Sequence, residues 1–456
     1  MKIQSLHLEN YRCFSNFDID FDPKLTVLVG VNGSGKTAVL DAVAVFLKIA
    51  MDKTSARPNP DLLESDTKVT NLDEAIRLCM EFSTCEHPEH NKRTSINCFC
   101  IPVNNTGLNP NQLLQKQRSC AKTDSCAKKG IIDLNVFRQN FSYPSQSGIP
   151  LLDSSKQLFI SVYYSAQRCL PKRSEAQPKT GKTSAFTEAF NPNINFNTTL
   201  KWFDAKDAEE ARTRSNNPDK KDYRNPVLKA VRDVVALALD DSENTYEFPH
   251  MDGVPPKLFV IHRATGISYE ATMLSDGYRT MLAMVMDLAR RMAMANEHVK
   301  WPEGQTVLHS SGIVLIDEVE LHLHPSWQQT VLPKLMEIFP NAQFIVTTHS
   351  PQVLTTVAAK HIRILKDGKA SSINDETEGA ESWRLLKDIF GVDPRPQNIK
   401  WVKKLNEYRE LVYREQWDSP DARALKQELE GHFAGTDPEL MELDLHVENS
   451  KWEREL

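Results

Sequence analysis

The sequence lacks any run of about 18 apolar residues, the minimum length for a membrane-spanning helix. Its first residues, MKIQSLHLENYRCF, are typical of an amphipathic strand and not of a cleavable signal peptide. We therefore expect a cytoplasmic protein with no membrane contact. With 40% hydrophobic and 25% charged residues, the 456-residue chain has the composition of a globular protein with a sizeable core.

The sequence also lacks an excess of basic residues, since 55 Lys and Arg stand against 61 Asp and Glu, a net charge of −6. This balance excludes a globally basic surface for nucleic acid, so any such contact would come from a local patch or from a partner. One stretch, residues 116–129, is locally basic, and a solvated loop is its simpler interpretation. No sustained heptad repeat is present, which excludes long coiled-coil arms.

The eight cysteines are scattered and form no disulfide framework, as expected in a reducing compartment. One group combines sulfur and imidazole ligands: Cys85, His87, His90, Cys98 and Cys100. A zinc site is one interpretation of this group. The alternative is that the cysteines of INCFCIPV are small buried residues of a strand, and the alternation of that segment favours it.

The strongest motif is a full G-x-x-x-x-G-K-T sequence at residues 30–37, between the apolar strand KLTVLVG and the apolar helix TAVLDAVAVFLKIA. In such a loop backbone N–H groups converge on phosphates, and the helix N-terminus adds its dipole. We expect Lys36 to neutralise the β- and γ-phosphates of ATP and the Thr37 hydroxyl to ligate Mg²⁺. The remaining contacts expected from the loop are Asn32, Gly33, Ser34 and Gly35.

Two further apolar strands end in residues that suit phosphate chemistry. GIVLID delivers Asp317 and Glu318 at its C-terminal end, where open parallel sheets bind ligands. We expect Asp317 to join the Mg²⁺ shell and Glu318 to polarise the attacking water. QFIVTTHS ends near His349, which could contact the γ-phosphate; a lone histidine is usually structural, but its position after the acidic pair favours function.

The segment LSDGYRT, residues 274–280, opens a helix predicted over residues 276–296. A purely structural interpretation makes Ser275 the N-cap. The functional interpretation uses the same helix N-terminus as an anion site for a nucleotide held by another subunit. A later helix is predicted over residues 326–338.

The glycine loop, LSDGYRT, the strand with the acidic pair and TTHS, in this order, resemble the motifs of the ABC ATPase superfamily. The segment VELHLHP and the opening strand IQSLHLENYRCF are similar to the RecF/OLD/SMC-like branch of that superfamily. In that superfamily two heads sandwich two ATP molecules, which implies that Ser275 and Gly277 contact the nucleotide on the opposite glycine loop. Asp276 and Tyr278 depart from the transporter pattern, which argues against a transporter. The resemblance also implies that Gln167 senses Mg²⁺ and the attacking water.

The same resemblance makes Arg12 a candidate nucleotide contact, with a surface salt bridge as the alternative. The segments YYSAQR, LSDGYRT, DEVELHLHP and TTHSP, with the tail segments DPRPQNI and DARALKQELEG, are similar to the PtuA-type ATPases of Septu anti-phage systems, also found beside some retrons. This similarity implies a PtuB-like HNH nuclease as partner and nucleic-acid contact through the complex.

We therefore expect an α/β protein with an ABC-type P-loop ATPase head, in which helices flank a mixed β-sheet. We also expect a helical insertion and a C-terminal helical appendage. The expected regions are an ATPase lobe with the glycine loop and a β-rich insert (1–170), a helical signature lobe (171–300), the Walker B and histidine-switch part (301–378), and a helical region that docks a partner (379–456). The expected assembly is a head-to-head dimer, and turnover should be slow because each site is complete only across the interface.

Two other functions stay open from the residues alone. A RecF-like DNA repair or recombination ATPase would act directly on DNA, which the acidic balance disfavours. A non-catalytic scaffold would only bind nucleotide, and the presence of Glu318 disfavours it. No His-Asn-His constellation with nuclease spacing appears and no room remains for a second catalytic domain, so no nuclease activity of its own is expected.

Overall fold

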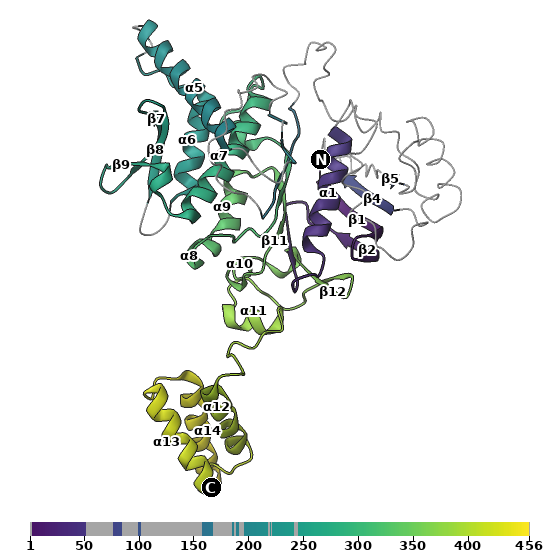
Figure 1. Ribbon diagram of the computed structural model, residues 1–456, viewed down its shortest axis with the longest axis vertical. Helices are drawn as coiled ribbons and strands as arrows, with labels where there is room; N and C mark the ends of the chain where they lie inside the picture. Colours follow the sequence, from purple (N-terminus) through teal and green to yellow (C-terminus); the bar gives the residue numbers. More distant parts are fainter. Residues whose placement is uncertain are drawn as a thin grey trace. The chain divides into compact units, whose positions relative to one another are not determined.

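The computed structural model describes residues 2–51, 76–83, 99–101, 157–166, 185–186, 188–190, 196–217, 219, 221–240 and 245–455. Contacts within the chain divide it into two compact units, Met1–Leu385 and Leu386–Leu456. The larger unit contains the three sheets, and the smaller one is helical (Figure 1). Among the described residues no helix is both long and apolar enough to cross a membrane.

A six-stranded mixed sheet forms the centre of the larger unit, in the order β13-β12-β3-β11-β10-β6. Its strands are β3 (Leu25–Val29), β6 (Ile160–Tyr164), β10 (Gly312–Ile316), β11 (Ala342–Thr347), β12 (Ile362–Lys366) and β13 (Lys369–Ser372). All neighbours pair in parallel except β13, which is antiparallel to β12. Every residue of β3, β6, β10 and β11 is buried, as in a sheet covered on both faces. The segments that follow β3, β10 and β11 therefore meet at one edge of the sheet.

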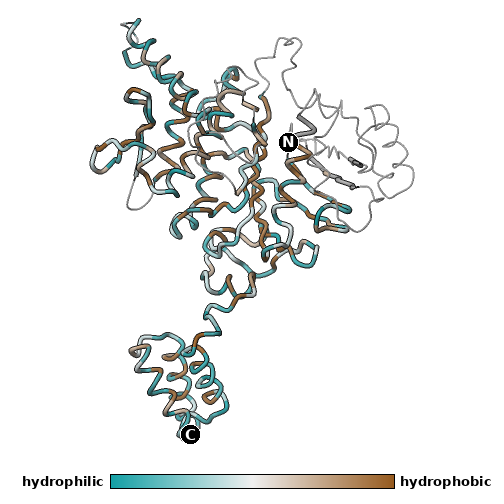
Figure 2. Tube along the Cα trace, viewed as in Figure 1, coloured by the Kyte–Doolittle hydropathy of each residue, from teal (hydrophilic) through white to brown (hydrophobic). Residues whose placement is uncertain are grey.

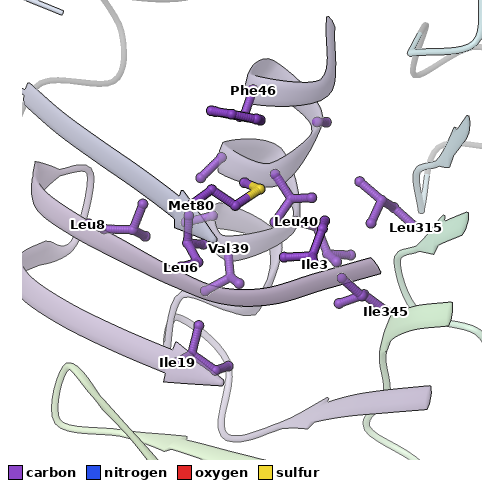
Figure 3. Packing of buried hydrophobic residues seen from close by; sticks show 14 of the residues in the cluster. Ile3, Leu6, Leu8, Ile19, Val39, Leu40, Phe46, Met80, Leu315 and Ile345 are labelled. Atoms are coloured by element: carbon purple, nitrogen blue, oxygen red, sulfur yellow. The ribbon is translucent and has the colours of Figure 1, made fainter. Parts of the chain in front are cut away.

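Helix α1 (Lys36–Met51) lies between this sheet and a second, antiparallel sheet of order β2-β1-β4-β5. The second sheet contains β1 (Lys2–Tyr11), β2 (Phe14–Asp20), β4 (Ile76–Ser83) and β5 (Phe99–Ile101). Figure 3 shows Val39 and Phe46 of α1 together with Leu6 of β1 and Met80 of β4, and with Ile345 of the central sheet. A helix packed on two sides must be apolar around most of its circumference, which explains the nearly continuous apolar sequence of α1.

The opposite face of the central sheet is covered by helices, among them α6 (Pro226–Ala238), α7 (Asp276–Asn296) and α9 (Val331–Ile338) (Figure 1). Helix α6 begins where its sequence predicts, because Asn225 accepts hydrogen bonds from two backbone N–H groups and proline occupies the first turn. A third sheet, β7 (Tyr246–Asp252), β8 (Lys257–His262) and β9 (Ser268–Glu270), is antiparallel. Helix α5 (Phe196–Asn216) is mostly hydrophilic, as Figure 2 shows. Two 3₁₀ turns, η4 (Ala271–Met273) and η5 (Val307–His309), precede α7 and β10.

A buried ionic cluster joins α7 to the central sheet. Asp287 of α7 is 1% exposed and forms ion pairs with Arg290 and Arg291. The Tyr164 hydroxyl at the end of β6 donates to its Oδ2 at 3.2 Å, and the Thr199 hydroxyl of α5 donates to its Oδ1 at 3.0 Å. Burial acts to raise the pKa of Asp287, but the two guanidinium groups outweigh it and hold that pKa well below its usual range. The cluster therefore fixes an ionised carboxylate where α5, α7 and β6 meet.

The smaller unit has its own core, formed by α12 (Lys400–Tyr413), α13 (Pro420–Phe433) and α14 (Pro438–Glu455). Leu405, Val412, Leu429 and Leu443 are among its buried residues. The short helix α10 (Pro351–Leu354) and the 3₁₀ turn η6 (Ala359–His361) connect β11 to β12, and the short helix α11 (Ser382–Asp388) follows β13.

One helix prediction needs correction, two strands were missed, and four of the five proposed zinc ligands lie outside the described residues. The single helix predicted over 326–338 is wrong, because the structure has α8 (Pro325–Gln328) and α9 separated near Thr330. Pro333, in the first turn of α9, has no N–H for an α-helical bond to residue 329, which interrupts the helical hydrogen bonds at this point. Strands β2 and β7 were not predicted. Of the proposed zinc ligands, Cys85, His87, His90 and Cys98 lie outside the described residues, and Cys100 belongs to β5.

Candidate functional site

A cavity of about 240 Å³ opens at the sheet edge where β3, β10 and β11 end. Its lining residues are Asn32, Gly33, Gly35, Lys36, Thr37, Ala38, Asp317, Glu318, Thr347 and His349. The structure therefore brings together the glycine loop, the acidic pair and the histidine, although the loop and the histidine are more than 300 residues apart in the sequence. Parallel pairing explains this, because β11 lies between β3 and β10 and all three strands run in the same direction.

The glycine loop places a buried cation at the cavity. The Lys36 side chain is 6% exposed, and its Nζ donates to the carbonyl oxygens of Gly30 at 2.8 Å and Val31 at 3.0 Å. Burial lowers the pKa of Lys36, and the nearby carboxylates of the cavity oppose that shift. Gly35 has φ +96°, and a Cβ there would lie 2.3 Å from Cζ of Phe14, so only glycine fits. Ser34, the remaining predicted loop contact, does not line the cavity.

Three oxygen-bearing side chains meet at the end of β10. The Thr37 hydroxyl donates to Oδ2 of Asp317 at 3.0 Å, and the Thr347 hydroxyl donates to Oδ1 at 2.6 Å. The backbone N–H of Glu318 donates to the same Thr347 oxygen at 2.7 Å. A hydroxyl beside a carboxylate is a donor set that suits a hard cation such as Mg²⁺. Thr37 and Asp317 therefore lie side by side at the cavity, and their role as Mg²⁺ ligands stays a prediction.

Glu318 and His349 are held by their backbones while both line the cavity. Glu318 adopts φ +48°, a left-handed conformation that costs energy for a residue with a side chain. The His349 N–H donates to Oε1 of Glu320 at 2.6 Å. The backbone of each residue is therefore held by a hydrogen bond, that of Glu318 to Thr347 and that of His349 to Glu320.

The signature segment does not line the cavity of its own chain. Ser275 is exposed at the N-cap of α7 and makes no side-chain cap hydrogen bond. A Cβ at Gly277 would lie 2.8 Å from the carbonyl oxygen of His322, so glycine is required for close packing within the subunit. The ring of Tyr278 contacts that of Trp327, with centroids 4.5 Å apart. The trans role expected of Ser275 and Gly277 stays a prediction.

The two remaining candidates differ in outcome. Arg12 forms an ion pair with Asp41 of α1 and does not line the cavity. In the single chain Arg12 is therefore in a salt bridge, the alternative to a nucleotide contact. Gln167 lies outside the described residues. Sequence reasoning missed Thr347 and Glu320, which position Asp317, Glu318 and His349; the Thr-Thr of TTHS and the glutamate of VELHLHP were the available signals.

A Thr347→Val variant should lower kcat for ATP hydrolysis by about tenfold to a hundredfold, because one hydrogen bond to a charged group and one to a backbone N–H are lost without a change of shape. The KM for ATP should change much less. Steady-state kinetics measure both quantities. Thr356→Val is the matched control, since that hydroxyl donates only to a carbonyl in its own turn. An unchanged kcat would show that Asp317 and Glu318 need no support from Thr347.

The comparisons with known proteins agree with this geometry. The family model for the AAA ATPase domain matches residues 1–354. The chain belongs to this AAA ATPase family. Members are ATPases, and the mixed sheet with its glycine loop and flanking helices confirms the predicted P-loop ATPase fold.

Three relatives of this AAA ATPase chain come from retron and Septu systems. The retron Ec83 probable ATPase of Escherichia coli is 28% identical over 99% of this chain and 88% of its own length. The retron Vc95 probable ATPase of Vibrio cholerae is 26% identical over 80% and 74%. The Septu protein PtuA of Bacillus mycoides is 38% identical over 21% of this chain and 12% of its own length. Similarity to Septu and retron ATPases is thereby confirmed.

Among solved structures, the SMC head domain from Thermotoga maritima covers 82% of this chain and 98% of its own, with 13% identity and a TM-score of 0.39.

Proposed function

We propose that this chain is the ATPase of an anti-phage defence complex, in which ATP binding closes a head-to-head dimer and hydrolysis reopens it. The observation that carries the proposal is the cavity itself. It combines Lys36, Thr37, Asp317, Glu318 and His349, while the signature segment lies outside it in the same subunit. A second subunit would supply that missing wall. The names of the retron and Septu relatives support the assignment to defence.

The residues of the cavity divide the chemistry among themselves. The backbone amides of the loop and Nζ of Lys36 bind the β- and γ-phosphates, replacing the carbonyl contacts of that lysine. Thr37 and Asp317 would hold Mg²⁺, which supplies charge neutralisation at the phosphates when bound. A Glu318 carboxylate oxygen accepts the proton of a water that attacks the γ-phosphorus, and the bond to the bridging oxygen breaks to release ADP. His349 contacts the γ-phosphate.

The coupled output would be a partner HNH nuclease, resembling PtuB, whose cutting depends on the nucleotide state of this chain. Nucleic acid would then contact the complex and not primarily this acidic subunit. The test is copurification with the protein encoded beside it, followed by nuclease assays with and without ATP. A bound HNH protein with nucleotide-dependent cutting supports the proposal. DNA-stimulated ATPase activity of the chain alone, with no such partner, favours the RecF-like alternative instead.

Mixing two inactive variants should restore activity if each site is built from two subunits. A Lys36→Ala chain keeps an intact signature, and a Ser275→Arg chain keeps an intact glycine loop. The arginine should fold normally because Ser275 is exposed and caps nothing through its side chain. A random mixture contains half heterodimers with one intact site each, so about a quarter of the wild-type ATPase rate should return.

The double variant Lys36→Ala/Ser275→Arg mixed with Lys36→Ala is the control, since no arrangement of these chains yields an intact site. Recovery in the first mixture alone supports the dimer. A Ser275→Arg chain that hydrolyses ATP normally, or a first mixture that stays inactive, contradicts the shared site.

A further inference from the structure

A short turn between β13 and α11 is bonded to the chain that follows α10 (Figure 1). We name residues 376–379 the anchor turn. The backbone N–H of Gly379 donates to the carbonyl of Thr355 at 2.7 Å. Thr377 is 2% exposed, and its hydroxyl donates to the carbonyl of Val357 at 2.5 Å. These bonds join two segments that are separated in the sequence by β12 and β13.

Glu376 adds a third connection between the two segments. Its Oε1 accepts the backbone N–H of Ala359 at 3.1 Å. The same oxygen accepts the N–H groups of Thr377 at 3.0 Å and Glu378 at 3.2 Å within the turn. These three N–H groups, that of Glu378 foremost, lower the pKa of Glu376, so its carboxylate is charged at neutral pH. A charged acceptor holds these donors more strongly than an amide oxygen would.

The segment that the anchor turn holds continues directly from the histidine of the cavity. Ser350, the residue after His349, caps α10 by accepting the backbone N–H of Val353. Val353 and Leu354 of this helix are completely buried, and Thr355 follows them. The chain from His349 to Thr355 is thus a capped and buried helical turn. A backbone shift at the cavity is therefore carried to the contacts of the anchor turn.

The other end of the anchor turn leads out of the larger unit. Helix α11 begins at Ser382, shortly after Gly379. Leu385 of this helix is 2% exposed and is the last residue of the larger unit, and the smaller unit begins at Leu386. The chain therefore reaches the smaller unit soon after it has been fastened to the segment behind His349. The hydrogen bonds of the turn make this route shorter than the one through β12 and β13.

We propose that the anchor turn passes the nucleotide state of the cavity to the smaller unit. Contact between the γ-phosphate and His349 shifts α10, and the bonds of Glu376 and Thr377 transfer that shift to the anchor turn. The chain that enters the smaller unit is tightened as a result. The inference rests on the proposed ATPase cycle and deepens it, because it gives a route from the nucleotide to the helical unit where we expect a partner to dock.

The test is amide hydrogen exchange of the full chain with and without a non-hydrolysable ATP analogue and Mg²⁺. In the wild-type chain the analogue should slow exchange about tenfold in residues 355–359 and in residues 380–399, where α11 leads into the smaller unit. In Glu376→Ala and Thr377→Val the slowing should persist at 355–359 but fall below about twofold at 380–399. Glu378→Ala is the matched control, because it removes an exposed carboxylate from the same turn and leaves the three bonds to Glu376 in place.

Affinity for the analogue and kcat are measured on every variant and should match wild type. A wild-type chain that does not bind the analogue contradicts the proposed function itself. If the analogue binds but leaves exchange at 380–399 unchanged, or if both anchor variants keep the slowing there, the role of the anchor turn is overturned. Weakened nucleotide binding in Glu376→Ala, or loss of the slowing in Glu378→Ala as well, would show that the turn is only structural and overturns it too.

Discussion

A Lys36→Ala variant is expected to lose ATP binding by a factor of about 10² to 10⁴. The lysine Nζ is held at the cavity by two loop carbonyls, so it is already in place for phosphate. Hydrogen bonds to charged groups each contribute about 1.5–3 kcal/mol, and two such bonds to phosphate account for the expected loss. Titration with a fluorescent ATP analogue measures the dissociation constant directly.

The control for this variant is Lys229→Ala on α6, where an exposed lysine pairs only with Asp233. Because Lys36 is buried, its removal also takes a donor away from the carbonyls of Gly30 and Val31, so thermal unfolding should be recorded for both variants. Lys36→Met keeps the apolar stem and separates lost charge from lost packing. ATP affinity within tenfold of wild type in a folded Lys36→Met chain would contradict the assignment of the glycine loop as the phosphate site.

A Glu318→Gln variant should bind ATP normally but hydrolyse it about 10³-fold more slowly. General bases contribute about 10² to 10⁴ in rate, and glutamine cannot accept the proton of the attacking water. The substitution preserves side-chain shape, and Thr347 can still accept the residue's backbone N–H. The chain should therefore retain ATP and accumulate as a dimer, which single-turnover kinetics and light scattering with ATP would measure.

Two comparisons sharpen this result. Glu303→Gln changes an exposed glutamate outside the cavity and should leave turnover at the wild-type level. Asp317→Asn should weaken Mg²⁺-dependent ATP binding itself, because Asp317 is placed to hold the cation beside Thr37. Wild-type turnover in Glu318→Gln would remove the proposed base, and trapping of ATP without dimerisation would remove the proposed dimer.

The arrangement of the cavity could be predicted because its residues follow strands that are recognisable in the sequence as short apolar runs. Short apolar runs end at residue 30, at Asp317 and near His349, and parallel strands place such ends at one edge. Thr347 could not be singled out in this way. It looks like an ordinary strand residue, and its role appears only when parallel pairing sets β11 beside β10.

The elements that escaped prediction have irregular patterns. In β2 the buried residues Phe14, Phe17 and Ile19 are spaced by three and then two, which breaks strict alternation. Strand β7 contains Pro249, and a proline within a segment argues against predicting a strand there. The structure accommodates this proline because β7 lies at the edge of its sheet, with a register shift in its pairing to β8. The requirement for glycine at 277 within its own subunit depends on the carbonyl of His322, 45 residues away, which no local pattern reveals.

Strand β3 carries the glycine loop, and both of its neighbours, β11 and β12, follow it by more than 300 residues. During synthesis, β3 therefore has no strand to pair with until nearly the whole ATPase unit has left the ribosome. Contacts of such long sequence separation slow folding, since the intervening chain must be closed before they form. A chain that ends before β11 and β12 therefore lacks both strands that pair with the strand carrying the glycine loop.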